Sequence, residues 1–309
     1  MDPQWKYLTQ NDETAMRGVI KYWMPHFAPA APAALYHYTR GETLIQIIES
    51  GKLWSTQIGC LNDTAEVRYG LEGLRRRIRE RRETAPAGRE IETLLRRLDQ
   101  VLSDPQLETA PAFVTCFSIL GDDLAQWRAY SGGEGGYAIR FDPQKLAKSG
   151  LSNEILLHRV EYDLGKQTTL LDDILTRAER YYIECEGRAR APNLEEWAQE
   201  FLQLYLSYIE TFLLCLKDPA FEAEREWRLV YTYRPDDPTC MCFRQRQSMM
   251  SRHLPLRLEG KLPITGVMVG PCRYPLLSRI AVSDLLQANG YDPAVIKEVA
   301  VTKIPYRAV

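Results

Sequence analysis

The sequence predicts an α+β fold in which mixed or antiparallel central sheets are interrupted by helical insertions. Strand-like runs such as 35–38 and 136–141 alternate with helical patterns in an irregular order, unlike the regular strand and helix repeat of a parallel sheet. Two stretches, at about 65–104 and 170–216, carry apolar residues at helical spacing. Hydrophobic residues make up 45% of the chain and charged residues 26%, as in a globular protein. We expect one domain over residues 1–309, with the two stretches as its insertions.

The first predicted strand, Leu35–Tyr38, runs directly into a predicted helix. Thr39 and Glu42 have the spacing of a capping box, and Gly51 provides the stop. A turn and helix start are expected at Asn62-Asp63. The remaining strands are expected at 53–58, 112–117, 156–162, 226–233, 264–269 and 299–304, with a helix-like turn at 122–130 and a helix at about 276–288.

The helical stretch 65–104 breaks at 84–88, which predicts a helical hairpin. Its first arm carries arginines at positions 75, 76, 77, 79, 81 and 82. Glu80 and Glu83 interleave with them, and aromatic stacking partners are missing. A solvated charged face is therefore favoured over a polyanion-binding surface.

Charge and cysteine usage narrow the classes of function. Lys and Arg number 39 against 41 Asp and Glu, so the formal charge of -2 gives no global field for nucleic acid or anionic lipid. The N-terminal segment holds acids and no apolar run, and nowhere do about 18 apolar residues follow one another, as a membrane span needs. Seven scattered cysteines fit a reducing compartment. We expect a cytoplasmic protein that does not contact a membrane.

Common catalytic and metal-binding motifs are missing from the sequence. Cys240 and Cys242 form only a C-x-C, without further ligands at zinc spacing. No H-E-x-x-H, G-x-S-x-G or Walker loop is present, and the glycines of 131–136 precede a predicted strand rather than a helix. We therefore expect no metal site, and a polar site would have to be assembled from short motifs.

The first such motif is Tyr36-His37-Tyr38-Thr39, in which two aromatic residues flank a histidine at a strand end. A histidine can donate a hydrogen bond to a ligand hydroxyl, and a tyrosine can stack on a flat ring. Alternatively, both tyrosines are packed and His37 satisfies a buried carbonyl. The spacing favours neither interpretation.

The second motif is Cys116-Phe117-Ser118 followed by Gln126–Tyr130. Trp127 and Tyr130 are one helical turn apart, with Arg128 beside them, an arrangement that suits a flat heterocycle and a phosphate. Ordinary packing under a loop is the simpler interpretation of aromatic residues at this spacing.

The third motif is an E-x-E at the mouth of a strand, formed by Glu224 and Glu226. Alternation along the strand places Glu226 and Arg228 on the face opposite Trp227 and Leu229. A carboxylate held there by a cation can orient a sugar hydroxyl or stabilise positive charge on a sugar carbon. A structural ion pair is the simpler interpretation.

Several strings are specific in combination: LYHYT, LND before an acidic helix, FVTCFS, QWRAY, GYAIRFD and K-x-P-x-F-x-x-E-x-E-W-R-L. Together they resemble a widespread bacterial family that is usually described only as a domain of unknown function. The resemblance runs from about Leu35 to Pro271. It implies one domain with helical insertions and names no activity.

The order of the three motifs is also distantly similar to that of the ADP-ribosyltransferase superfamily. This resemblance implies an ADP-ribosyltransferase-like core, NAD as the substrate and no metal. It gives His37, with Thr39 beside it, the first position, which holds the nicotinamide riboside. Tyr130, or alternatively Ser118, takes the second position beneath the nicotinamide.

In the same resemblance, Glu226 matches the catalytic glutamate and Glu224 the outer one. The chain departs from the superfamily in three respects: the second motif is not a clear S-T-S, helical insertions stretch the spacing, and Trp227-Arg228 follows the glutamate.

The implied reaction breaks the nicotinamide glycosidic bond of NAD and transfers ADP-ribose to a protein, a nucleic acid or water, as in a toxin or defence effector. The nicotinamide would lie between aromatic residues, and Arg128 or Arg228 would meet the pyrophosphate. The aromatic candidates are Tyr36, Tyr38, Trp127 and Tyr130.

Two other classes of function stay open on the sequence. One is a metal-independent nuclease, in which His37 and Glu226 act as general base and acid and the arginine-rich hairpin meets the phosphates. The other is a sensor that binds a nucleotide or a partner protein without turnover.

Overall fold

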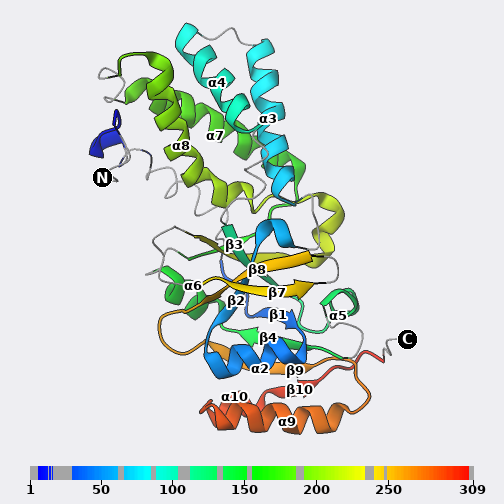
Figure 1. Ribbon diagram of the computed structural model, residues 1–309. Helices are drawn as coiled ribbons and strands as arrows, with labels where there is room; N and C mark the ends of the chain where they lie inside the picture. Colours follow the sequence, from blue (N-terminus) through cyan, green and yellow to red (C-terminus); the bar gives the residue numbers. More distant parts are fainter. Residues whose placement is uncertain are drawn as a thin grey trace. The chain divides into compact units, whose positions relative to one another are not determined.

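The computed structural model describes residues 6–12, 14, 16, 30–61, 66–84, 88–103, 112–130, 135–151, 155–185, 191–233, 240–246 and 249–305 (Figure 1). The chain divides into two compact units. The helical unit combines Met1–Pro29, Leu61–Ala110 and Val160–Ala220, and the sheet unit combines Ala30–Cys60, Pro111–Arg159 and Phe221–Val309. Helices and a largely antiparallel sheet together confirm the α+β prediction. The expectation of one domain stays a prediction.

The helical unit is built from four long helices: α3 Glu66–Thr84, α4 Arg89–Val101, α7 Leu164–Glu184 and α8 Leu194–Leu213. Asp163 and Asn193 cap the last two, because their side chains accept hydrogen bonds from the amides of Lys166 and Glu196. Apolar stripes face inward, so α4 packs on α8 and α3 on α7. Fully buried members of this core include Ile78, Leu94, Leu98, Ile174, Trp197 and Phe201.

Arginines of the helical hairpin are bound to carboxylates of the same unit. Arg77 donates from Nε and Nη2 to Asp172, at 2.8 Å each. Arg82 contacts Glu92, and Arg81 contacts Glu179 at 3.1 Å. These pairs agree with the predicted solvated charged face.

The sheet unit contains β1 Leu35–Thr39, β2 Leu53–Gln57, β3 Ala112–Ser118, β4 Tyr137–Phe141, β5 Leu156–Arg159, β6 Glu226–Thr232, β7 Cys242–Arg246, β8 Met249–Leu256, β9 Ile264–Val269 and β10 Val299–Val301. Their order is β10-β9-β4-β1-β3-β2-β8-β7, and β6 pairs with β3 and β5. The described pairings are antiparallel except that of β9 with β10.

Strand β3 is the point at which this sheet branches. One edge pairs with β6 over its whole length. The other edge pairs with β2 at Phe113 and Val114, and with β1 only at Ser118. Two arms of the sheet therefore leave the same edge of β3 in different places.

Helices α2 Gly41–Ser50, α5 Leu124–Tyr130, α6 Pro143–Leu151, α9 Pro275–Ala288 and α10 Pro293–Lys297 surround the strands, with short 3₁₀ turns η1 Ile58–Cys60 and η4 Pro219–Glu224. The main core lies on the face that carries Phe117, Phe141 and Leu229. Helix α2 buries Leu44, Ile47 and Ile48 in this core. Helix α9 packs along β9 and β10 on the outer side of the unit (Figure 1).

Several sequence predictions need correction. Thr39 belongs to β1 and Arg40 is the N-cap of α2 without a side-chain cap bond, so the predicted capping box is wrong. Gly51 does end α2, with φ 61°, a conformation that favours glycine. The sequence predictions omitted α6, α10 and the β7–β8 hairpin. Asn62, Asp63 and most of the 131–136 glycine cluster lie outside the described residues.

Candidate functional site

Tyr36, Ser118 and Glu226 form a row across three neighbouring strands. Tyr36 of β1 lies directly opposite Ser118 of β3, which lies directly opposite Glu226 of β6. Residues that are directly opposite in an antiparallel sheet point to the same face, so the three side chains share one face. Ser118 and Glu226 are buried, whereas Tyr36 is half-buried. The row stands at the C-terminal end of β3 and the N-terminal end of β6.

Glu226 is held by Arg228 in a two-pronged ion pair. The Arg228 Nε donates to Glu226 Oε1 at 2.8 Å, and its Nη2 donates to Oε2 at 2.9 Å. Arg228 has no exposed surface and Glu226 is 5% exposed. Trp227 and Leu229 lie in the main core on the opposite face, as alternation predicts. Both charges are therefore fixed and largely shielded from water.

The turn before Glu226 has an unusual backbone. Arg225 has φ 46°, the left-handed region that non-glycine residues seldom adopt. Its carbonyl accepts a hydrogen bond from the Ile119 amide at 3.4 Å. The Ser118 hydroxyl donates to the Glu224 carbonyl at 2.8 Å and accepts from the Leu120 amide at 3.1 Å. Ser118 thus joins the end of β3 to the turn that aims Glu226.

Glu224 is the last residue of η4 and is half-buried. It takes part in this turn through its carbonyl. The structure therefore places the E-x-E next to Ser118, with Glu224 and Glu226 on either side of the left-handed residue.

His37 lies next to the row but on the other face of β1. Its ring contacts Phe117 with centroids 5.8 Å apart, and its Nδ1 lies 2.8 Å from the Cys116 carbonyl oxygen. Because that carbonyl can only accept, Nδ1 carries the proton and Nε2 keeps its lone pair. Burial lowers the pKa of His37, although the bond to Cys116 opposes this, so the ring is neutral near pH 7.

The position of His37 satisfies a backbone carbonyl, one of the two readings of the sequence. No described residue makes a hydrogen bond to its Nε2. The Nε2 nitrogen can accept a hydrogen bond on this face of the strand. His37 and Glu226 nevertheless point to opposite faces, so they are not a simple acid and base pair across one bond.

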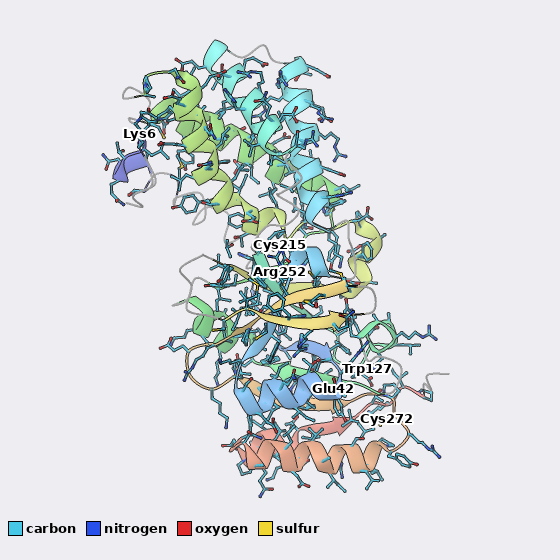
Figure 2. The ribbon with its side chains drawn as sticks, viewed as in Figure 1. Lys6, Glu42, Trp127, Cys215, Arg252 and Cys272 are labelled. Carbon is cyan, nitrogen blue, oxygen red and sulfur yellow. The ribbon has the colours of Figure 1, made fainter. Side chains whose placement is uncertain are left out.

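Tyr38 and Trp127 pack against each other and are tied to the loop after β3. Trp127 is fully buried, its ring lies 4.7 Å from that of Tyr38, and its Nε1 donates to Asp122 at 2.8 Å. The Tyr38 hydroxyl donates to the Leu120 carbonyl at 2.7 Å and accepts from the Asp123 amide. Trp127 is labelled on α5 in Figure 2. Its buried ring offers no face to a ligand.

The other residues of the first two motifs lie outside the row of Tyr36, Ser118 and Glu226. Thr39 is buried at the end of β1. Tyr130 packs against the cluster of Tyr38 and Trp127, and Arg128 is exposed on α5. Helix α5 contacts β1. Ser118, rather than Tyr130, is the second-motif residue that lies opposite Glu226.

Sequence reasoning missed Gly121, Asp122 and Arg225. A Cβ atom on Gly121 would come within 2.5 Å of the Tyr36 ring, so glycine lets that ring pack on the loop after β3. Asp122 accepts bonds from Trp127 and from the Lys303 amide. A Gly-Asp pair three residues after the end of a buried strand was the available signal. Nothing in the sequence marks Arg225 as left-handed.

Within the described residues, no group of three or more His, Cys, Asp or Glu side chains could hold a metal ion. Nor does any described helix have the length and apolarity that a membrane crossing requires.

Comparison with known families gives a partial match. Residues 126–229 match the model of a family described as "Protein of unknown function (DUF2971)". The matched part begins at Gln126 of α5 and ends at Leu229 of β6, so it includes QWRAY, GYAIRFD and the E-x-E-W-R-L segment. This supports the predicted resemblance to a domain of unknown function family. No curated protein and no solved structure matches the chain.

Proposed function

We propose that the sheet unit is an ADP-ribosyltransferase-like enzyme that cleaves the nicotinamide glycosidic bond of NAD. The row of Tyr36, Ser118 and Glu226 is the observation that carries this proposal. It brings one residue from each of three motifs that are far apart in sequence to the same end of three adjacent strands. Convergence of this kind is expected of a site and not of three unrelated packing motifs.

Glu226 has the central role. Arg228 fixes both oxygens of the Glu226 carboxylate, so the carboxylate needs no reorganisation when a substrate arrives. A carboxylate in this state accepts a hydrogen bond from the 2′-hydroxyl of the nicotinamide ribose. It also stabilises the positive charge that develops on the ribose carbon as nicotinamide leaves.

Tyr36 and Ser118 complete the side of the site that faces Glu226. Tyr36 is the half-buried aromatic residue of the row, so its ring is the surface on which the nicotinamide stacks. Ser118 takes the second-motif position in place of Tyr130, because Ser118 lies directly opposite the glutamate. Trp127 and Tyr38 support Tyr36 from below and do not contact NAD.

His37 follows Tyr36 on β1, but its side chain points to the opposite face of the sheet from Tyr36, Ser118 and Glu226. Its hydrogen bond to the Cys116 carbonyl holds β1 beside β3, and so supports the strand end that carries Tyr36. Arg128 is exposed and can meet the pyrophosphate. The acceptor of ADP-ribose is a protein, a nucleic acid or water, and the setting is that of a toxin or defence effector.

One observation favours a second function, that of a nucleotide-binding protein without turnover. The two-pronged bond to Arg228 already engages both oxygens of Glu226, as in a purely structural ion pair. The nuclease alternative loses support, because arginines of the hairpin are engaged by Asp172, Glu179 and Glu92.

The test is nicotinamide release from NAD by the purified protein, with a cell lysate as the source of acceptors. Wild type is compared with Glu226→Gln and with Glu222→Gln, a matched control because Glu222 is an exposed carboxylate only four residues away. The proposal predicts release that Glu226→Gln reduces at least a hundredfold, the usual scale for loss of one transition-state charge contact. Glu222→Gln leaves the rate unchanged.

Folding must be separated from chemistry, since Glu226→Gln leaves Arg228 without its charged partner. Thermal unfolding of each variant supplies the folded fraction, and NAD binding is measured by calorimetry. Binding without release by folded wild type would support the nucleotide-binding alternative. Neither binding nor release under any acceptor condition would overturn the proposal.

A further inference from the structure

Helix α9 is apolar on two opposite faces. Val282 and Leu286 are buried on the side that packs along β9 and β10. On the outward side, Leu276 and Leu277 are each 65% exposed and Ile280 is 53% exposed. Soluble helices normally present charged or polar residues there. Three large aliphatic side chains on neighbouring turns form a contiguous patch, which marks an interaction surface.

This outward stripe has the spacing of a helix-pairing seam. Within the helix its residues are Leu277, Ile280 and Asp284, at intervals of three and four positions, and Arg273 lies four positions before Leu277. Intervals of three and four keep one stripe of the helix facing a partner helix. Arg273 stands in the turn just before the helix, next to Cys272, which Figure 2 labels.

The positions 273, 277, 280 and 284 are symmetric about the midpoint between Ser278 and Arg279. Two copies of α9 that lie antiparallel, with a two-fold axis between Ser278 and Arg279, therefore place Leu277 of one copy opposite Ile280 of the other. Leu276 meets Ala281 in the same register. A two-fold contact uses the same surface on both copies and must be complementary to itself, which this register satisfies.

The charges at the two ends of the stripe are also complementary in this register. Arg273 of one copy lies opposite Asp284 of the other, twice per dimer. Both residues are exposed, and neither makes a salt bridge with another described residue. Arg273 rests on the Tyr274 ring, 5.3 Å from its centroid, and Tyr274 is itself 56% exposed. A parallel pairing would instead put like charges together.

We propose that the outward stripe of α9 is a dimer interface, occupied by α9 of a second copy in antiparallel orientation. The apolar residues supply the association energy and the Arg273 and Asp284 pairs fix the direction. The stripe lies on a different element from the row of Tyr36, Ser118 and Glu226, so this proposal stands or falls independently of the proposed function.

The first experiment is sedimentation equilibrium of the full chain over a range of protein concentrations. Wild type is compared with Ile280→Glu and with Ile183→Glu. Ile183 is a matched control because it is also a helical isoleucine and is 52% exposed. Ile280→Glu is expected to weaken dimerisation by more than tenfold, since two buried charges would face the partner helix. Ile183→Glu should leave it unchanged. A wild-type chain that is monomeric at all concentrations would overturn the proposal.

The second experiment tests the direction of pairing by charge exchange. Arg273→Glu and Asp284→Arg each create like-charge contacts in the antiparallel dimer, and each should weaken it roughly tenfold. The double variant restores opposite charges and should return the dissociation constant close to that of wild type. Because both positions are exposed, folding is not at risk. Additive weakening in the double variant would overturn the antiparallel register.

Discussion

Polar side chains have different environments in the two units of the molecule. In the helical unit, charged residues such as Arg77 and Asp172 are partly exposed and neutralise each other over an apolar core. At the branch of the sheet, Glu226 and Arg228 are buried, Arg225 has a strained backbone and His37 keeps a lone pair. Buried charges and strained backbone lower stability, and such features cluster at functional sites. This contrast is what the proposed function leads us to expect, with the site at the strand ends and the charged surface of the helices serving stability.

The largest effect is expected from breaking the buried ion pair. Arg228→Met leaves the Glu226 carboxylate buried without its cation and should cost about 3–5 kcal/mol of unfolding free energy. The double variant Glu226→Leu with Arg228→Met removes both charges and should recover much of that loss. Urea unfolding of wild type, of each single variant and of the double variant gives the coupling. Equal losses in the single and double variants would contradict a tightly coupled pair.

The second prediction is that one buried group in each unit makes stability depend on pH in opposite directions. Burial lowers the pKa of His158 in β5 to about 4 and raises the pKa of Glu210 in α8 to about 7. Unfolded His158 gains its proton below about pH 6.5, so its stabilising contribution is lost as the pH falls from about 6.5 toward 4. Between about pH 4.5 and 7, the Glu210 carboxyl is ionised in the unfolded chain but still protonated in the folded one. The contribution of Glu210 to the free energy of unfolding is therefore lost as the pH rises through this range.

Each group can therefore shift stability by up to about 3 kcal/mol, with opposite signs in the two units. His158→Gln should reduce the loss of stability on acidification, and Glu210→Gln should reduce the loss on raising the pH. Urea unfolding at pH 5 and pH 7 measures both. A change of the same sign in the two variants would show that one of these assignments is wrong.

The third prediction concerns the packing that holds Tyr36. Gly121→Ala puts a methyl group against the Tyr36 ring, which must move, at a cost of about 1–2 kcal/mol. NAD binding should weaken as well, because the ring is displaced. Gly88→Ala is the control in the helical unit, where an added Cβ would meet nothing within 4 Å. Calorimetry with NAD and thermal unfolding measure the two effects. Unchanged binding in Gly121→Ala would remove Tyr36 from the site.

The smallest effect is expected in the helical unit. Arg77→Met removes a partly exposed pair with Asp172 and should cost no more than about 1 kcal/mol, with less effect at high salt. Chemical unfolding at two salt concentrations provides the measurement. A loss as large as that of Arg228→Met would erase the contrast between the two units.

The sequence predicted most elements because their signals are local. Apolar spacing located α3, α4, α7 and α8, and alternation placed Glu226 and Arg228 on one face of β6. The β7–β8 hairpin was missed, since its residues lack a clear two-residue period. Capping failed at Thr39 because strand pairing with Tyr137 extends β1 through that residue.

The candidate site was only partly predictable, because register is a property of the sheet and not of any one strand. Motif spacing could select His37, Ser118 and Glu226 as residues of interest. It could not show that Ser118 lies opposite Glu226 while His37 turns to the other face. Nor could it separate an accessible aromatic residue from the fully buried Trp127.

Hydrogen exchange with and without NAD tests the central claim most directly, since it reports on both units in one measurement. A site at the branch of the sheet predicts slower amide exchange on adding NAD in 36–39, 118–121 and 225–228, and no change in α3, α4, α7 and α8. Protection confined to the helical unit, or none anywhere at saturating NAD, would contradict a site at the branch of the sheet.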